Sequence, residues 1–270
     1  MAPEYVSARL DFDLHIHSSH SCDAKSTIDE MCRGAIRKGL STICFTEHVD
    51  MNPKDIGYGY FQTERYIQDV ERARENYQGQ LTILKGVEFS EPHQYPREFE
   101  NLIKADFDFV LGSVHWIEGF GAYWSDKDRL LPNYPTQRLF ETYYQEVLQA
   151  VRFGGFDSLA HIDFPKRYLA GKYEPAALLD EVTAELVKKS IALELNSHPI
   201  RKGYPEINPS DDICAIYARY GGQAVTTGSD AHAPEDIGED FDRLDRIIDI
   251  NTFHPVCFTK RRMVHIDSHG

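Results

Sequence analysis

Short apolar runs rich in β-branched and aromatic residues alternate along the chain with segments whose apolar residues recur every three to four positions. The first pattern predicts strands and the second predicts helices. The strand candidates are Leu10–His17, Thr42–His48, Thr82–Phe89, Phe109–His115, Ser158–His161, Ile191–Asn196 and Ala224–Ser229, seven in all. Helical segments separate most of them, so the pattern predicts repeated β-then-α units of an α/β protein.

The first connection shows how the helices are delimited. Thr27 can cap a helix with Glu30 three residues later, and Gly39 follows the end of the helix. Further helices are expected over Thr63–Gly79, Thr136–Phe153, Pro175–Lys189, Pro209–Tyr220 and Asp240–Asp249. Seven such units favour a parallel sheet closed, or nearly closed, into a barrel, and an open doubly wound sheet is the alternative. Without an evident linker or repeat, residues 1–270 are expected to form a single domain.

Composition narrows the class of protein. Of 270 residues, 41% are hydrophobic and 27% are charged, an ordinary mix for a globular protein. No apolar run approaches the roughly 20 residues that span a bilayer, and the N-terminal residues lack a secretory apolar stretch. We therefore expect a cytoplasmic protein. Five cysteines without CxxC spacing predict free thiols. The net charge of −14 opposes binding to nucleic acid polymers or anionic membranes, while the oligomeric state stays open.

Candidate metal ligands mark the ends of nearly all the predicted strands. They are His15, His17, Glu47, His48, Glu88, His115, His161, Asp230 and His232. Because the carboxyl ends of parallel barrel strands lie on one face, these side chains should converge there. His15 and His17 lie two apart on one strand, so both point to the same side. Imidazoles mixed with carboxylates suit zinc, manganese or iron, and no glycine-rich phosphate loop follows any strand.

Glu88 and Asp230 each admit two interpretations. Glu88 ends the apolar run LKGVEFS, where an unpaired buried carboxylate would be unfavourable. Bridging two cations would explain it, and a salt bridge to a neighbouring Arg or Lys is the alternative. Asp230, in TTGSDAH, could be a metal ligand or a helix N-cap.

An ordered set of segments extends this pattern over most of the chain: DLHIHSSHSCDA, FTEHVD, GVEFS, GSVHW, AHIDFPKRY, ELN with IRKG, and GSDAH. Together they resemble the PHP (polymerase and histidinol phosphatase) family, in particular its histidinol-phosphatase branch. The resemblance implies a distorted (β/α)7 TIM-like barrel with two or three divalent metal ions at the C-terminal face of the strands. This agrees with the strand count obtained from the hydrophobic pattern.

The resemblance also implies which residues hold each ion. One ion is expected between His15, His17, Glu88 and Asp230, and a second between Glu88, His115 and His161. Glu88 would then bridge the two. The third would be held by Asp23, His48 and His232. Histidine often stands in this branch where the chain has Asp23, so the sequence departs from the pattern at the third ion.

Hydrolysis of a phosphate monoester by a metal-bound hydroxide is the reaction that the resemblance implies. The catalytic residues would be His232, Asp230 and Glu88, with His232 the candidate proton donor to the leaving alcohol. No covalent phospho-enzyme is required.

Substrate contacts are expected from four residues that match positions near the substrate in the family or lie beside them: Arg167, Arg201, Lys202 and His198. Solvated loop charges are the alternative for the basic ones. Glu47 would orient a metal-binding histidine without binding the ion itself. The connections Asp50–Gln62 and Trp116–Pro135, which carry several aromatic residues, would wall the site.

L-Histidinol phosphate, hydrolysed to L-histidinol and phosphate in histidine biosynthesis, is the expected substrate. Another small phosphate ester, such as a nucleotide, is the main alternative. Amidohydrolases that cleave C–N bonds also begin with HxH and end with an Asp, but a carboxylated lysine would be expected where Glu88 stands. A structural domain of a polymerase is the remaining alternative, and the full ligand set favours an enzyme.

Overall fold

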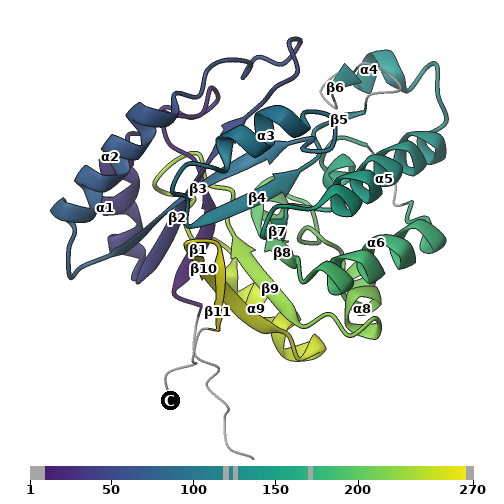
Figure 1. The fold of residues 1–270 in the computed structure, drawn as a ribbon. Helices are drawn as coiled ribbons and strands as arrows, with labels where there is room; N and C mark the ends of the chain where they lie inside the picture. Colours follow the sequence, from purple (N-terminus) through teal and green to yellow (C-terminus); the bar gives the residue numbers. More distant parts are fainter. Residues whose placement is uncertain (1–9, 118–121, 124–126, 170–172, 266–270) are drawn as a thin grey trace, which may run out of the picture.

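A mostly parallel sheet forms the centre of the protein (Figure 1). The structure is a computed structural model that describes residues 10–117, 122–123, 127–169 and 173–265. Within these residues nine strands pair in the order β1-β2-β3-β4-β7-β8-β9-β10-β11. Their bounds are β1 Phe12–Ile16, β2 Thr42–Val49, β3 Thr82–Ser90, β4 Phe109–Ser113, β7 Ser158–Leu159, β8 Ala192–Asn196, β9 Ala224–Gly228, β10 His254–Thr259 and β11 Arg262–His265. A separate pair joins β5 (Trp116–Ile117) to β6 (Ala122–Tyr123).

Each of the seven predicted strands has a counterpart, from β1 to β4 and from β7 to β9. All of these pair in parallel, which confirms the α/β class. The count of seven is wrong for the whole sheet, because β10 adds a parallel strand beside β9 and β11 returns antiparallel to β10. β10 carries Pro255, which lacks a backbone donor, and its side chains alternate in burial, so its apolar signal is weak.

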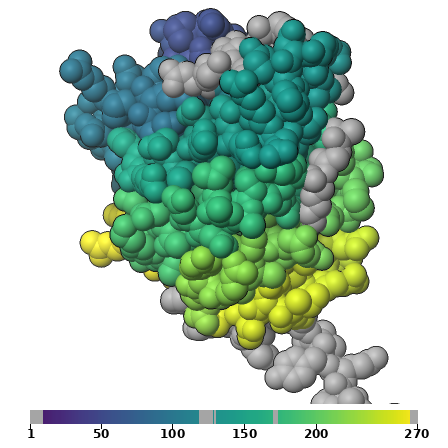
Figure 2. All heavy atoms as spheres, turned by 90° about the vertical axis from the view of Figure 1, so that its right-hand side faces the viewer, coloured from purple at the N-terminus to yellow at the C-terminus, as the bar shows by residue number. Residues whose placement is uncertain are grey.

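Helices cover the sheet from outside (Figure 1). They are α1 Ile28–Lys38, α2 Thr63–Asn76, α3 Pro96–Leu102, α4 Lys127–Leu130, α5 Thr136–Phe153, α6 Ala176–Lys189, α7 His198–Arg201, α8 Asp211–Arg219 and α9 Phe241–Asn251, with a 3-10 turn at Phe164–Arg167. Figure 2 shows the face of the molecule on which the later parts of the chain follow one another, from teal to yellow. All five residues of β1, β4 and β8 are buried, as expected for parallel strands covered on both faces.

Helix α1 shows why the local sequence folds as it does. The Thr27 side chain accepts a hydrogen bond from Glu30 N, the Glu30 carboxylate accepts one from Thr27 N, and Gly39 ends the helix at φ +77°. This confirms the predicted capping box and C-terminal glycine. Met31 and Ala35 lie four residues apart on the buried face, so capping and amphipathic packing agree.

The two ends of the predicted strand series lie side by side. Asp230 N donates to His15 O at 2.7 Å, and His17 N donates to Ala231 O at 2.8 Å. Gly228 permits this approach, because a Cβ there would lie 2.4 Å from the Cβ of His15. The C-terminal ends of β1 and β9 therefore meet. The N-terminal residues of β10 pair with the N-terminal residues of β9.

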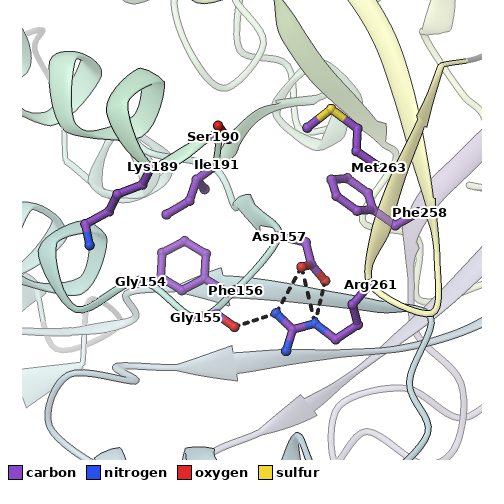
Figure 3. A pocket seen from close by; sticks show the side chains of 10 residues that line it. All are labelled: Gly154, Gly155, Phe156, Asp157, Lys189, Ser190, Ile191, Phe258, Arg261 and Met263. Atoms are coloured by element: carbon purple, nitrogen blue, oxygen red, sulfur yellow. Dashed lines mark hydrogen bonds and ion pairs between the residues drawn. The ribbon is translucent and has the colours of Figure 1, made fainter.

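The β10–β11 hairpin packs against the N-terminal ends of β4 and β7. Lys260 and Arg261 form its two-residue turn with φ +48° and +61°, the backbone shape that suits a tight hairpin. The Arg261 guanidinium donates to both carboxylate oxygens of the buried Asp157 at 2.9–3.2 Å and to Gly155 O. Figure 3 shows this pair beside a cavity of about 470 Å³.

The sequence predicted no membrane-spanning segment and predicted that the cysteines are free thiols. Among the described residues, no helix is both long enough and apolar enough to cross a bilayer. All five cysteines lie in the described part of the chain and are free, which confirms the prediction from their spacing.

Replacing Arg261 by methionine should lower the free energy of unfolding by about 1–3 kcal/mol, because the buried Asp157 carboxylate would lose its charged donor. Urea denaturation monitored by circular dichroism measures this change. Arg262→Met is the matched control, since Arg262 is exposed and forms no described ion pair. Equal stability of the two variants would show that the ion pair does not anchor the hairpin.

Candidate metal centre

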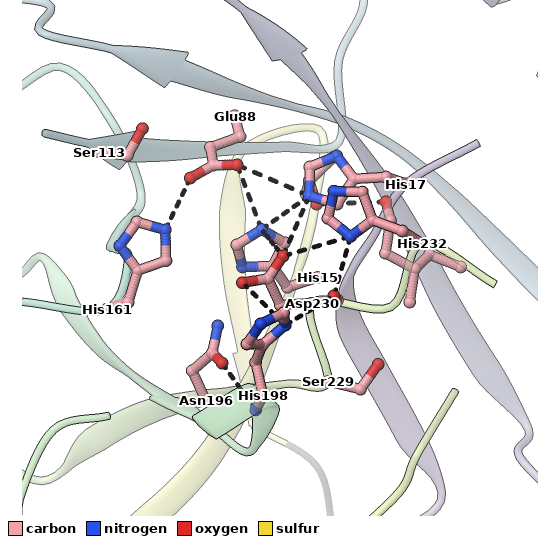
Figure 4. A network of polar contacts seen from close by, with 12 residues as sticks. His15, His17, Glu88, Ser113, His161, Asn196, His198, Ser229, Asp230 and His232 are labelled. Carbon is pink, nitrogen blue, oxygen red and sulfur yellow. Dashed lines mark hydrogen bonds and ion pairs between the residues drawn. The ribbon is translucent and has the colours of Figure 1, made fainter. Parts of the chain in front are cut away.

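Imidazoles and carboxylates from six strands converge at the C-terminal face of the sheet. Figure 4 shows six of these side chains, those of His15, His17, Glu88, His161, Asp230 and His232. β1, β2 and β3 end near His15, His17, His48 and Glu88. Three later strands lead into His115, His161, Asp230 and His232. The predicted convergence follows from parallel topology, because it places all carboxyl ends on one face.

Glu88 lies at the middle of the cluster and is fully buried. Its Oε1 lies 3.0 Å from His161 Nε2 and 3.3 Å from His115 Nε2. Its Oε2 lies 3.2 Å from His15 Nε2 and 3.6 Å from His17 Nε2. Oε2 also lies 3.1 Å from His48 Nδ1. The two oxygens of one carboxylate therefore face two different sets of imidazoles, and no Arg or Lys pairs with Glu88 in the described residues.

Asp230 also faces His15 and His17. Its Oδ1 lies 3.5 Å from His17 Nε2 and 3.7 Å from His15 Nε2, while its Oδ2 accepts from Arg167 Nη1 at 2.8 Å. The residue has φ +53°, a backbone conformation that is rare outside glycine. No helix starts at Asp230, so the N-cap alternative is not observed.

A third group lies on the side of the cluster that faces solvent. Asp23 Oδ2 lies 3.1 Å from His232 Nε2 and 3.5 Å from His48 Nε2. The rings of His48 and His232 both stack on that of His17, with centroids 4.2 and 4.3 Å away. The structure thus brings Asp23 to the two histidines expected beside it.

Each of three imidazoles is held through its Nδ1 by a partner outside the cluster. His15 Nδ1 donates to Glu194 at 2.5 Å. His17 Nδ1 donates to Ser21 Oγ at 3.0 Å, and Ser21 in turn donates to Glu47 at 2.6 Å. This is the supporting position expected for Glu47.

The second relay runs through His115, whose Nδ1 donates to Ser90 Oγ at 2.9 Å, while Ser90 donates to Asp50 at 2.7 Å. These hydrogen bonds favour the tautomer that carries its proton on Nδ1, so that each ring in its neutral form presents the Nε2 lone pair toward the cluster. Sequence reasoning missed Glu194, Ser90 and Asp50. Glu194 carried a usable signal, since it is a carboxylate inside the apolar run IALELN, as Glu88 is in LKGVEFS.

The electrostatics of the cluster call for positive charge. Burial alone would raise the pKa of Glu88, but His15, His48 and His115 hold it well below its usual range. Burial alone would lower the pKa of His115, yet the Glu88 carboxylate raises it to about 10. In contrast, burial together with His48 and His232 lowers the pKa of His17 well below its usual value.

This donor set fits divalent metal ions. In each of four groups of residues, the ligand atoms lie within 4.8 Å of one another. The groups are His15, His17 and Glu88; His48, Glu88 and His115; His15, His161 and Asp230; and His17, His48 and His232. The Nε2 atoms of His15 and His17 are only 3.0 Å apart. Two inward lone pairs at that distance repel unless a proton or cation lies between them. Mixed imidazole and carboxylate donors suit zinc, manganese or iron.

A cavity of about 220 Å³ opens beside the cluster. Of the predicted substrate-binding residues, Arg167, His198 and Lys202 line it, and Arg201 does not. Arg167 also donates to Asn208 Oδ1 at 2.9 Å and to Asn196 Oδ1 at 3.2 Å. These hydrogen bonds, with the ion pair to Asp230, fix the guanidinium at the cavity wall.

Arg201 lies behind the wall of the cavity. Its Nη2 donates to Ser229 O at 2.7 Å and lies 3.3 Å from both Asp230 O and His198 Nδ1. Its guanidinium therefore holds the backbone that precedes and includes Asp230.

Aromatic walls come from residues other than those expected. Phe164 and Tyr168 line the cavity, whereas no described residue of the Asp50–Gln62 or Trp116–Pro135 connections does. Tyr58 and Tyr60 are about half exposed, and Tyr60 donates to Ser19 O. The expectation that these loops wall the site is therefore wrong for the described residues. Trp124, in the second connection, lies outside them.

Comparison with known proteins places this geometry in a family. The chain is 32% identical to the "Probable histidinol-phosphatase" of Clostridium acetobutylicum over 93% of this chain and 98% of the relative. It is 29% identical to the histidinol-phosphatase of Lactococcus lactis over 82% of this chain and 83% of the relative.

A solved structure supports the fold. The crystal structure of histidinol phosphate phosphatase from Lactococcus lactis, in complex with zinc, L-histidinol and phosphate, matches with a TM-score of 0.81 at 24% identity. The match covers 94% of this chain and 98% of that one. The sequence pattern of the PHP domain matches residues 13–198. The chain belongs to the PHP domain family.

Proposed function

We propose that this protein is a metal-dependent phosphomonoesterase that hydrolyses L-histidinol phosphate to L-histidinol and phosphate in histidine biosynthesis. The observation that carries the proposal is the position of Glu88, whose two buried oxygens face separate sets of imidazoles beside a cavity lined by Arg167 and Lys202. The names of the relatives support this choice of substrate.

For the metal ions we propose the assignment expected from the sequence. His15, His17, Glu88 and Asp230 would hold one ion, Glu88, His115 and His161 a second, and Asp23, His48 and His232 a third. Bound ions would act as Lewis acids toward the phosphoryl oxygens and acidify water, for zinc to a pKa of about 7. An acidic Glu88 at the bridging position, instead of a carboxylated lysine, argues against an amidohydrolase.

The chain's own residues orient the ester. Arg167 presents a fixed guanidinium at the cavity wall, suited to bidentate binding of phosphoryl oxygens, and Lys202 adds charge at the exposed rim. His198 lies between Asp230 and Arg201 on the same wall. For Arg201 we propose support of the Ser229–Asp230 backbone in place of direct contact with phosphate.

His232 is our candidate proton donor to the leaving alcohol. It lines the cavity, and its Nδ1 is held by Asp230 O at 3.0 Å. Its Nε2 can give up a proton only while no ion is bound there. The roles of proton donor and third-ion ligand therefore exclude one another at any one moment.

The larger architecture is part of the proposal. We infer that the sheet closes as a distorted (β/α)7 TIM-like barrel, supported by the hydrogen bonds between the ends of β1 and β9. Residues 1–270 would form a single domain. Five free thiols suit a reducing compartment such as the cytoplasm, and a small phosphorylated molecule, not a nucleic acid polymer or membrane, is the proposed partner.

Substrate choice is tested by phosphate release from L-histidinol phosphate beside nucleotides, sugar phosphates and p-nitrophenyl phosphate, using protein of determined metal content. We expect kcat/KM to be at least about 100-fold higher for L-histidinol phosphate, because binding energy from the alcohol portion lowers the barrier. Equal or better hydrolysis of another ester would agree with the phosphatase activity but would exclude L-histidinol phosphate as the preferred substrate. Metal-loaded protein inactive on every ester would contradict the reaction class.

Replacing Glu88 by glutamine should lower kcat more than about 100-fold and reduce bound metal, because a neutral amide cannot balance two cations. Plasma mass spectrometry of dialysed protein and phosphate release measure the two effects. Glu100→Gln, an exposed position on α3, is the control and should match the wild type. Normal turnover with a full metal complement in Glu88→Gln would exclude the bridging role.

The two arginines should differ in their kinetic effect. Arg167→Met should raise KM about tenfold, because it removes a charged donor from the cavity wall. Arg201→Met should instead lower kcat and metal content with little change in KM, because it loosens the Ser229–Asp230 backbone. Steady-state kinetics at fixed metal concentration separate the two. A rise in KM alone for Arg201→Met would instead indicate direct contact with substrate.

A further inference from the structure

The proposed substrate carries opposite charges at its two ends. L-Histidinol phosphate joins an anionic phosphoryl group to an alcohol that bears a primary ammonium group and an imidazole. Cations bound at the metal centre and the guanidinium of Arg167 would serve the phosphoryl end. They would repel the ammonium end, so selective binding calls for a carboxylate elsewhere in the same cavity. This inference rests on the proposed function.

The cavity offers three carboxylates among its described lining residues, Asp23, Asp230 and Asp236. Two of them are already engaged. Asp230 faces His15 and His17 and pairs with Arg167, and Asp23 Oδ2 lies within 3.5 Å of His48 and His232.

Asp236 is the remaining carboxylate, and it is not among the proposed metal ligands. Its side chain is 36% exposed, so it is accessible from the cavity without being freely solvated. The described cation nearest to it is Arg201, whose Nε lies 3.6 Å from Oδ1. That distance is too long for a good hydrogen bond, and no described residue donates a hydrogen bond to Oδ2. Asp236 thus retains acceptor capacity toward the cavity.

The loop that carries Asp236 is fixed relative to the metal centre. It follows β9 directly after Asp230, and Asp236 N donates to Ala233 O at 3.1 Å. Farther along, Gly238 N donates to the buried Asp13 at 3.0 Å, and Ser197 Oγ donates to Glu239 O at 2.7 Å. These bonds place the carboxylate before a ligand arrives, which reduces the entropy lost on binding.

We propose that Asp236 is a specificity-determining residue that binds the ammonium group of the substrate and so selects phosphate esters of amino alcohols. The phosphoryl group would lie toward Arg167 and the metal centre. The carboxylate of Asp236 accepts hydrogen bonds from the ammonium group across the cavity. Tyr168, which is half-buried and lines the same cavity, provides ring surface for the remaining apolar part of the alcohol.

A purely structural role of Asp236 predicts a different effect on ester hydrolysis. If Asp236 serves only to neutralise Arg201, its replacement acts through the Ser229–Asp230 backbone and lowers turnover of every ester to the same degree. A substrate that lacks only the amino group separates the two roles, because it removes the proposed contact and leaves the phosphate and imidazole in place.

The experiment compares wild type and Asp236→Asn on L-histidinol phosphate and on 3-(imidazol-4-yl)propyl phosphate, which lacks the amino group. Asparagine keeps the shape of the side chain and removes its charge. We expect the ratio of kcat/KM for the two substrates to fall about fivefold to tenfold in Asp236→Asn, mainly through KM. Glu235→Gln is the matched control, because Glu235 is an exposed neighbour outside the cavity, and the ratio should keep its wild-type value.

The outcomes are distinct. An unchanged ratio in Asp236→Asn, whatever the absolute loss, would overturn the proposed ammonium contact. An equal fall in Glu235→Gln would assign the effect to the general charge of the loop and also overturn it. Wild-type protein that fails to hydrolyse L-histidinol phosphate would instead contradict the proposed function, and this inference with it.

Discussion

The convergence of imidazole lone pairs on the buried carboxylate of Glu88 is the constraint on which the site depends. Several Nε2 atoms lie within 3.6 Å of Glu88, and those of His15 and His17 lie 3.0 Å apart. Such an arrangement is stable only with positive charge at its centre, supplied by protons or by metal ions. Parallel topology places the groups on one face, and hydrogen bonds at Nδ1 of His15, His17 and His115 orient their rings.

Part of the backbone strain lies around the same cluster. Glu91, His161 and Asp230 all have positive φ, which costs free energy for residues other than glycine. Glu91 accepts hydrogen bonds from His115 N and Trp116 N, and Asp230 N is tied to His15 O. Glu91 and Asp230 are therefore held by bonds that also position candidate ligands. Precise ligand placement is obtained at the expense of local stability, as is common in functional sites.

Much of this could be predicted from the sequence, because the signals were local. Strand ends, the Thr27 cap and the candidate ligands each depend on a few adjacent residues. The β10–β11 hairpin escaped prediction since its strands are half exposed and include Pro255. Glu194 was missed because its role depends on His15, 179 positions away. Whether Arg201 points into the cavity or away from it depends on tertiary contacts, which the spacing of residues in the sequence does not reveal. For the same reason the sequence could not show that the described residues of the two aromatic connections lie outside the cavity wall.

The Arg167–Asp230 pair links the metal centre to the cavity. Asp230 Oδ1 faces His15 and His17, while Oδ2 binds Arg167. A cation bound at Oδ1 would draw negative charge from the carboxylate and weaken its hold on the guanidinium. Arg167 would then be freer to bind phosphate, while Asn196 and Asn208 keep it in place. This local charge also explains how a chain of net charge −14 can bind an anion, because screening beyond about 8 Å leaves the nearest groups dominant.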